Sequence, residues 1–376
     1  MPWKEVSTMS ARKEFVLLAS QEHANVRALC RQFGISPKTG YKLLNRYKNQ
    51  GDEGLADRSR RPKSSPNKAS PQAENLILGL RKQHPAWGAH KLLARLEALG
   101  HRDLPCPSTV TAILKRHGLV DPEKAAQHQP WQRFEHPAPN DLWQMDFKGH
   151  VALREGRCHP LTVLDDHSRY AVCLKACANE QGETVKAALT EAFRRYGLPW
   201  RMTMDNGAPW GDDGHNPYTA FTVWLLHLGI HISHSRPYHP QTQGKDERFH
   251  RTLKGELLAH ETFADLDVAQ RRFDGWRDLY NLERPHQALG QKPPVSRYRA
   301  STRAFPENLP AIDYAPDDAV RKVQGKGEIY YQGRAWKVGK AFQGYPVALR
   351  TTAEDGQMAV YFCQHRVATV DLREPQ

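Results

Sequence analysis

The chain has 376 residues, and no apolar run reaches the roughly 18 residues that a membrane-spanning helix needs. No apolar stretch follows the first five residues, so we do not expect a secretory signal or a membrane partner. Six cysteines are scattered without a CxxC pair, which disfavours a zinc ribbon or a disulfide scaffold. This cysteine usage is typical of the reducing cytoplasm.

Positive charge is concentrated at the start of the chain. Lysine and arginine number 54 against 41 aspartate and glutamate, a net charge of +13. Residues 1–120 hold 21 basic and 9 acidic residues, a net charge of +12, so the remaining 256 residues are nearly neutral. A basic segment joined to a near-neutral body indicates a module that binds a polyanion such as nucleic acid. The alternative is a basic surface that only aids solubility.

Residues 1–55 are predicted to contain a helix-turn-helix domain. Apolar residues recur at helical spacing from Val26 to Phe33, and Gly34 suits the end of that helix. Ser36 and Pro37 then form a cap and first-turn pair for a helix over 37–49. A helix, a tight turn and a capped second helix make the helix-turn-helix pattern.

The second of these helices is expected to turn Tyr41, Leu44 and Tyr47 inward. Its exposed face would then be presented to the major groove of double-stranded DNA, through Lys38, Thr39, Lys42, Asn45 and Arg46. A small helical bundle without a ligand is the alternative interpretation.

Glycine, proline and arginine become frequent from Gly51 on, and residues 56–71 are predicted to be a linker. Its Arg58, Arg60 and Arg61 could lie along DNA phosphates or enter a minor groove, or the linker could simply be solvated. Residues 72–120 repeat the helical theme around 76–80 and 87–99, with a third helix capped by Ser108. They suggest a second helix-turn-helix domain, followed by a polar linker over 121–139.

Near residue 140 the apolar periodicity changes from helical to alternating. Strands are predicted at 142–153, 159–165, 170–176, 201–204 and 230–233, and helices at 184–196, 218–228, 245–259 and 265–283. This order predicts an α/β domain over 140–300 with a mixed five-stranded sheet. Residues 305–376 hold short strands separated by glycine-bearing turns, which predicts a small β-barrel of about five strands.

Three acidic residues lie where an α/β sheet places chemistry. Asp146 interrupts an apolar strand, Asp205 ends the short strand at 201–204, and Glu247 lies early in a helix. A lone charged carboxylate within an apolar strand is unfavourable unless it is paired or bound to a metal. Carboxylate oxygens suit Mg²⁺ or Mn²⁺, and two such ions would support an in-line phosphoryl transfer. Taken singly, each residue is more simply a turn former or a cap.

The chain resembles DDE transposases of the IS481 group, which are close to IS3 transposases and retroviral integrases. The similarity extends over nearly the whole chain, and the matching runs lie at residues 54–62, 143–146, 164–169, 205–207, 236–254 and 281–289. The run at 236–254, RPYHPQTQGKDERFHRTLK, is the most specific of them. The resemblance implies an RNase H-like catalytic core that cuts and joins DNA at the terminal inverted repeats of a mobile element.

The resemblance implies that Asp146, Asp205 and Glu247 form the catalytic triad of this sequence. These residues would bind two Mg²⁺ ions, for which Mn²⁺ could substitute. Lys254, seven residues after Glu247, would contact DNA near the site, unless it is merely solvated. Asp246 adjoins Glu247 and could compete for the ligand role. The chain departs from the family in that Asp205 and Glu247 are 42 positions apart, a longer spacing than usual. The extra residues are expected in a loop over 208–216.

Several other polar residues are better explained by structure. Asp165, Asp166 and Ser168 are expected to form a turn that bonds its own backbone. His231 and His234 should face opposite sides of a strand, so a zinc cluster is not favoured, whereas His239 could touch phosphate. Two sets are expected to pack in the core, namely Cys173 with Cys177 and the stripe of Phe249, Leu253 and Leu257.

The leading hypothesis is an active transposase that works as at least a dimer, because two DNA ends must be handled together. It would be cytoplasmic and would associate with the nucleoid when bound to DNA. A catalytically inactive, DNA-binding regulator derived from a transposase is the alternative. A nuclease for RNA hybrids is disfavoured, since A-form grooves do not admit a recognition helix. The basic residues of 305–376 allow either target-DNA binding or assembly.

Overall fold

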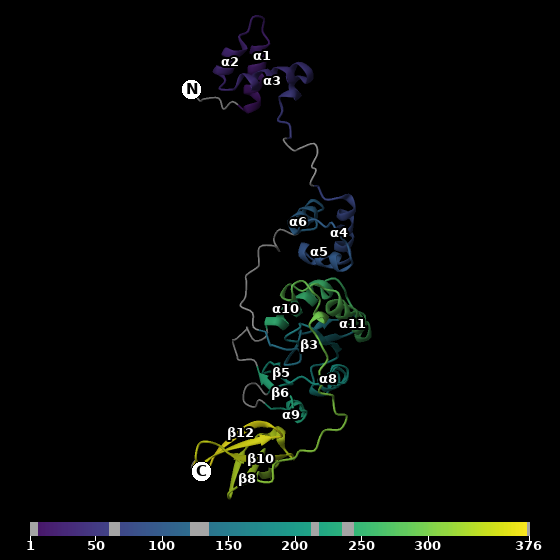
Figure 1. The fold of residues 1–376 in the computed structure, drawn as a ribbon, viewed down its shortest axis with the longest axis vertical. Coiled ribbons are helices and arrows are strands. Elements are labelled where there is room, and N and C mark those ends of the chain that lie inside the picture. The colour runs from purple at the N-terminus through teal and green to yellow at the C-terminus, as the bar shows by residue number, and fades with distance from the viewer. Residues whose placement is uncertain (1–6, 60–67, 121–134, 212–217, 235–243, 374–376) are drawn as a thin grey trace. The chain divides into compact units, whose positions relative to one another are not determined.

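The computed structural model describes residues 7–59, 68–120, 135–211, 218–234 and 244–373. The chain divides into two compact units, Met1–Lys68 and Ala69–Gln376, which are coloured along the chain in Figure 1. Within the described ranges, no helix combines the length and the apolar character that a membrane span requires.

The first unit contains three helices, α1 (Thr8–Ala19), α2 (Val26–Gln32) and α3 (Pro37–Gln50). Their shared core is built on Phe15, Val16 and Cys30. The turn between α2 and α3 is the predicted one, since Gly34 has a φ of 64° and the Ser36 side chain accepts the N–H of Thr39. The helix-turn-helix prediction is confirmed at the level of fold.

The inward face of α3 differs from its prediction in one position. Tyr41 is 49% exposed, and Leu43 joins Leu44 in the core instead. A short 3₁₀ helix, Gly51–Leu55, then folds back on α3, and the Leu55 carbonyl accepts a hydrogen bond from Arg12 at 2.8 Å. Gly54 is required there because a Cβ atom would lie 2.4 Å from the Arg46 carbonyl oxygen.

The second unit begins with α4 (Pro71–Gln83), α5 (Ala89–Ala98) and α6 (Pro107–Arg116). Their core contains Ile77, Trp87, Leu92 and Val110, and Leu279 from a later helix packs against it. The predicted cap at Ser108 is wrong, because Cys106 is the N-cap residue and Pro107 starts α6. Proline at the first helical position needs no N–H partner, and the helix begins two residues earlier than predicted.

The central sheet contains β1 (Leu142–Phe147), β2 (Val151–Ala152), β3 (Arg157–Asp165), β4 (Ala171–Cys177), β5 (Arg201–Met204) and β6 (His231–His234). Its order is β2-β3-β1-β5-β6, with β4 on β3. The β1–β3 pair is antiparallel, whereas β1–β5 and β5–β6 are parallel. The predicted mixed sheet is confirmed, with the two-residue β2 as a sixth strand.

One predicted strand of this sheet is wrong. The run 142–153 is broken into β1 and β2, with Gly149 between them at a φ of 81°. A left-handed backbone conformation cannot continue a strand, so β1 ends at Phe147 and Asp146 becomes its penultimate residue.

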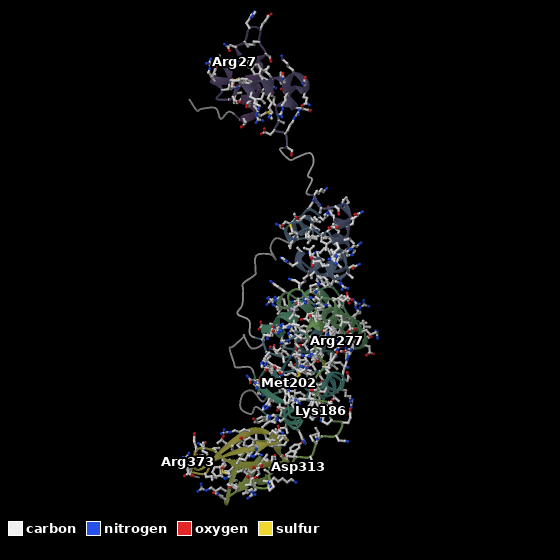
Figure 2. The ribbon with its side chains drawn as sticks, viewed as in Figure 1. Arg27, Lys186, Met202, Arg277, Asp313 and Arg373 are labelled. Atoms are coloured by element: carbon white, nitrogen blue, oxygen red, sulfur yellow. The ribbon has the colours of Figure 1, made fainter. Side chains whose placement is uncertain are left out.

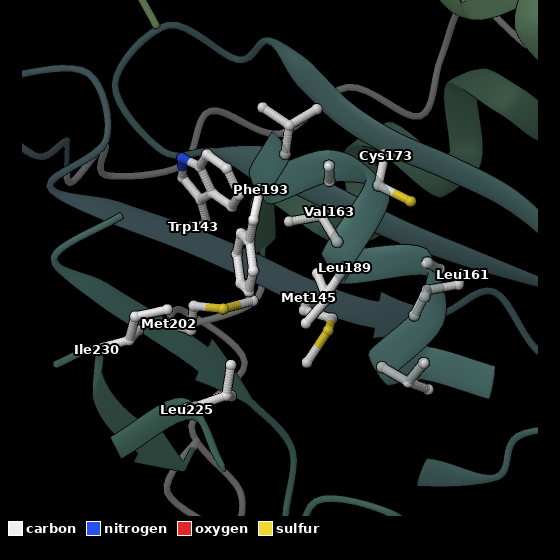
Figure 3. Packing of buried hydrophobic residues seen from close by; sticks show 14 of the residues in the cluster. Trp143, Met145, Leu161, Val163, Cys173, Leu189, Phe193, Met202, Leu225 and Ile230 are labelled. Atoms are coloured by element: carbon white, nitrogen blue, oxygen red, sulfur yellow. The ribbon is translucent and has the colours of Figure 1, made fainter. Parts of the chain in front are cut away.

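Helices cover both faces of the sheet. The helices α8 (Gly182–Tyr196) and α9 (Ala220–His227) pack on the face that carries Trp143 and Met145 of β1. Figure 3 shows Trp143, Met145 and Phe193 gathered in this core. Side chains alternate along a strand, so Gln144 and Asp146 face the other side.

That other side is covered by α10 (Gly244–Leu253) and α11 (Leu266–Leu282), through Phe249, Leu253 and Phe273. The predicted packing stripe is confirmed, since Phe249, Leu253 and Leu257 are all buried. A π-helical turn, Lys254–Leu258, follows α10, and two 3₁₀ turns, Gln287–Leu289 and Pro294–Ser296, follow α11. Figure 2 shows the side chains that fill this part of the chain, with Lys186 of α8 and Met202 of β5 labelled.

The last part of the chain is a small β domain with β7 (Ala319–Lys322), β8 (Glu328–Tyr331), β9 (Arg334–Lys337), β10 (Pro346–Thr351), β11 (Gln357–Phe362) and β12 (His365–Asp371), plus a 3₁₀ turn at Lys340–Phe342. It is a four-stranded sheet in the order β12-β11-β10-β7 and a separate β8–β9 hairpin, whereas the prediction was a small β-barrel of about five strands. The prediction missed β7, which is mostly exposed and has no apolar alternation. Val223 and Leu226 of α9 share its core.

Candidate active site

Two of the three predicted carboxylates lie on neighbouring parallel strands. Gln144 of β1 pairs with Thr203 of β5. Continued by two residues, that register brings Asp146 level with Asp205, which directly follows β5. Parallel strands end at the same edge of a sheet, so the β1–β5 pairing brings these two side chains into one neighbourhood.

The electrostatics of Asp146 reflect this neighbourhood. Its side chain is 27% exposed, and burial together with the nearby Asp205 carboxylate raises the pKa of Asp146 to about 7. Two like charges held together in a partly buried site are unfavourable without a cation or a proton. The pair therefore has the electrostatic character of a divalent-cation site.

The segment after Asp205 is folded tightly against β1. The Gly207 N–H donates to Oδ1 of Asp205 at 3.1 Å, and the Asp205 carbonyl oxygen lies 2.8 Å from Nδ1 of His234. Trp210 is 2% exposed, and its ring stacks on Phe147, the residue after Asp146, with a centroid distance of 5.5 Å. The start of the predicted extra loop is thus packed into the core, whereas residues 212–217 lie outside the described part of the chain.

The start of α10 turns Asp246, rather than Glu247, into the protein. Asp246 is fully buried, and neither of its carboxylate oxygens has a hydrogen-bond partner among the described residues. Burial, Asp146 and Asp166 together raise the pKa of Asp246 well above its usual value. Glu247 is exposed. Within the described ranges, no three His, Cys, Asp or Glu side chains are grouped to hold a metal, so the predicted triad is not gathered around one point.

A histidine that the sequence reasoning missed lies beside Asp146. His250 of α10 is 8% exposed, and its Nδ1 is 3.9 Å from Oδ2 of Asp146. Its Nε2 is 2.8 Å from Oγ1 of Thr162, which donates to the Asp146 carbonyl oxygen at 2.9 Å. Burial, and to a lesser degree Lys148, lowers the pKa of His250 to about 4. The sequence feature that could have pointed to His250 is a polar residue among the apolar positions that bury one side of a helix.

A second polar cluster lies behind the site. Asp166 is buried, forms an ion pair with Lys245 and accepts hydrogen bonds from Gln144 and from the His136 N–H, each at 2.8 Å. The neighbouring Asp165 accepts the Ser168 N–H at 2.8 Å, as the predicted self-bonded turn requires.

The predicted DNA-contacting residues are mostly accessible. Four residues of α3 are exposed and Arg46 is half-buried; the exposed four are Lys38, Thr39, Lys42 and Asn45. Arg58 and Lys254 are exposed as well, and Arg58 donates to Gln50 at 2.5 Å. Arg60, Arg61 and His239 lie outside the described residues.

The histidines of β6 and the cysteines of β4 have structural explanations. His231 lies 3.2 Å from His365 of β12, Nδ1 to Nδ1, and His234 contacts the Asp205 carbonyl oxygen. Cys173 and Cys177 are buried in the core as predicted.

Comparison with protein families gives matches to most of the domains described above. Residues 12–63 match a helix-turn-helix domain and residues 39–114 a homeodomain-like domain. Residues 136–240 and 228–294 each match an integrase core domain. Residues 318–376 match the C-terminal domain of IS481 family transposases.

Individual relatives come from mobile elements and retroviruses. An uncharacterized 39.2 kDa protein of insertion element IS476 from Xanthomonas euvesicatoria is 30% identical over 175 residues, 45% of this chain and 49% of that protein. The chain thus spans about half the length of that relative. A putative transposase of IS5376 from Geobacillus stearothermophilus is 21% identical over 97% of this chain and 89% of its own. A solved intasome chain of simian T-cell lymphotropic virus is 17% identical, with a TM-score of 0.38, over 78% of this chain and 99% of that chain.

The chain thus combines an α/β core that matches the integrase core domain with preceding segments that match helix-turn-helix domains. The C-terminal part of the chain is similar to the C-terminal domain of IS481 family transposases, the group whose motifs the sequence resembles.

Proposed function

We propose that this protein is an active DNA transposase that binds the terminal inverted repeats of its element, cleaves their 3′ ends and joins them to target DNA. The observation that carries the proposal is the pair of mutually repelling carboxylates, Asp146 and Asp205, at the edge of the sheet where β1 and β5 end. Both hydrolysis and strand transfer are direct attacks on phosphorus, by water and by a 3′-hydroxyl, so no covalent enzyme intermediate is required.

The residues present offer the carboxylate oxygens that divalent cations bind. Asp146 and Asp205 repel each other, and the nearby, buried Asp246 has no hydrogen-bond partner among the described residues. We assign Asp146, Asp205 and Glu247 as the ligands of two Mg²⁺ ions, for which Mn²⁺ would substitute. Bound ions would activate the attacking oxygen and stabilise the leaving oxygen.

The protein's own residues position this chemistry. The β1–β5 pairing and the Gly207 N–H hold the two aspartates in place, and α10 supplies the third carboxylate. Glu247 has that role by the family motif, although Asp246 is the one buried here. Lys254, two turns further along, is available to a DNA phosphate.

DNA recognition falls to the basic first 120 residues. In the proposal, α3 enters the major groove with Lys38, Thr39, Lys42, Asn45 and Arg46, while Arg58, Arg60 and Arg61 follow the phosphates. Ser36 supports this arrangement because its side chain caps α3 through the Thr39 N–H at 3.2 Å. The active form is a homo-oligomer of at least two copies, since two element ends must react together.

A strand-transfer assay with the element's own ends and Mg²⁺ tests the proposal. We expect the native protein to cleave and join, and Asp205→Asn to lose at least 100-fold in rate, on the order of a lost charge-stabilising group. DNA binding by the variant should stay within about threefold, because Asp205 lies outside the helix-turn-helix domains. A native protein that binds its ends without cleaving them would favour the inactive regulator instead.

A further inference from the structure

The hydrogen bonds around Thr162 determine which nitrogen of His250 carries a proton. Thr162 is fully buried, and its hydroxyl must donate to the Asp146 carbonyl oxygen at 2.9 Å, because a carbonyl can only accept. A hydroxyl has one proton, so its contact with Nε2 of His250 at 2.8 Å must use an oxygen lone pair. Nε2 therefore donates, and a neutral His250 carries its proton there.

The lone pair of His250 then lies on Nδ1, on the side of the Asp146 carboxylate. Nδ1 is 3.9 Å from Oδ2 of Asp146, too far for a hydrogen bond. Metal–ligand bonds are about 2.1 Å long, so two donors that share one ion lie between about 3 and 4 Å apart. The separation between these two acceptors therefore fits the space that one cation fills.

Three elements hold this imidazole in place. Asp146 and Thr162 are direct cross-strand partners in the β1–β3 pair, and His250 comes from α10 above them. The ring is 8% exposed, and its helix is anchored by the buried Phe249 and Leu253. Asp246 precedes His250 by four residues and is buried as well, so these two side chains project on nearly the same side of α10.

We propose that His250 is a nitrogen donor to the divalent cation held by Asp146, and that Thr162 fixes the ring's tautomer and orientation. This rests on the proposed function, which it deepens by adding an imidazole to an otherwise all-carboxylate site. Mn²⁺ belongs to the first-row series of metals that accept nitrogen ligands, whereas Mg²⁺ is a hard cation that takes oxygen ligands. Removing His250 should therefore weaken Mn²⁺ binding more than Mg²⁺ binding.

The direct test uses the full-length protein with Mn²⁺ alone. Pulsed electron paramagnetic resonance detects a ¹⁴N nucleus bonded to Mn²⁺, and titration calorimetry measures the affinity. We expect a ¹⁴N signal in the native protein that is lost in His250→Phe, together with a roughly tenfold weaker Mn²⁺ affinity. The matched control is His231→Gln, since the imidazole of His231 contacts that of His365 of β12; it should keep the signal.

Substitutions of Thr162 provide a second, milder test. Thr162→Ser keeps the hydroxyl and should keep the ¹⁴N signal. Thr162→Val removes the hydroxyl and should weaken both the ¹⁴N signal and the Mn²⁺ affinity. Melting curves identify any variant that fails to fold.

Bound Mn²⁺ without a ¹⁴N signal in the native protein, or a signal that survives His250→Phe, would overturn the assignment. If such a protein still transfers strands, only the imidazole ligand is refuted; if it neither binds Mn²⁺ nor cleaves DNA, the proposed function also fails.

Discussion

At the scale of single residues, the site is a set of charges held in unfavourable surroundings. Asp146 is partly buried beside Asp205, and Asp246 is fully buried near both Asp146 and Asp166. Carboxylates in such positions raise the free energy of the charged state, and this energy is recovered only when a cation or a proton neutralises them. Ionisable groups with such unfavourable electrostatic surroundings are concentrated at functional sites.

The first residue-level prediction concerns Asp146→Asn in metal-free protein at pH 8. Removing one of two repelling charges should stabilise the fold by roughly 2–4 kcal/mol, the free energy that corresponds to its raised pKa. Thermal unfolding should show a higher Tm for the variant without Mg²⁺. Added Mg²⁺ should then raise the Tm of the native protein and leave that of the variant nearly unchanged. A lower Tm for the metal-free variant would contradict the repulsion argument.

The second residue-level prediction separates the two acids of α10. Glu247→Gln should abolish cleavage while leaving stability within about 0.5 kcal/mol, because Glu247 is exposed. Asp246→Asn should retain cleavage and stabilise the protein by roughly 1–3 kcal/mol, since it removes a buried charge. Parallel cleavage assays and denaturant titrations measure both effects. The reverse pattern would assign the third ligand to Asp246.

At the scale of elements, the longer spacing between Asp205 and Glu247 begins with a packed segment. Trp210 lies between Phe147 of β1 and Phe221 of α9, with ring centroids 5.5 and 5.8 Å away. It therefore supports the end of the strand that carries Asp146. The sequence predicted only a loop here, because the segment is rich in glycine and proline. The single tryptophan, Trp210, is the residue that packs the segment against the core.

Trp210→Ala should destabilise the protein by about 3–5 kcal/mol, as expected for deleting a large, fully buried ring. It should also weaken Mg²⁺ binding, because Phe147 and the end of β1 lose their support. Urea unfolding and calorimetry measure the two effects. Trp200→Ala is the control: this ring is 56% exposed and contacts Arg303 by a cation–π interaction, so its loss should be at most about 1 kcal/mol. Equal losses for both would mean that Trp210 does not anchor the segment.

At the scale of the whole molecule, the second unit is joined by contacts between distant parts of the chain. The β domain shares a core with α9, and His365 of β12 meets His231 of β6. Burial, and secondarily His231, lowers the pKa of His365 to about 4, and burial lowers that of His286 to about 3. These rings must stay neutral for the folded state to be favoured.

The unfolding free energy should therefore fall as the solution is acidified. In the unfolded chain these histidines take up protons near pH 6.5, whereas in the folded protein they do so only near pH 4 or below. Their stabilising contribution is complete above about pH 6.5 and is lost progressively down to about pH 4. Denaturant titrations at several pH values should show His365→Gln to be less acid-sensitive by roughly 2 kcal/mol. Identical pH profiles for the variant and the native protein would refute this.

Local signals in the sequence were sufficient for most elements. The cap and turn at Gly34, Ser36 and Pro37 predicted the boundaries of α2 and α3 closely, and the alternating residues of 201–204 predicted β5. Errors arose where a signal depended on neighbours far along the chain. Tyr41 was assigned inward by spacing alone, although Leu43 is the residue that meets α1 and α2, and β7 owes its existence to pairing with β10.

Helix caps, strand alternation and short motifs are local properties, so they predicted the domain types and put Asp146 and Asp205 on neighbouring strands without knowledge of distant contacts. The side chains of α10 that face the sheet are set by tertiary packing, because the rotation of a helix is determined by what it packs against. That rotation buries Asp246 and places His250 beside Asp146 and Thr162.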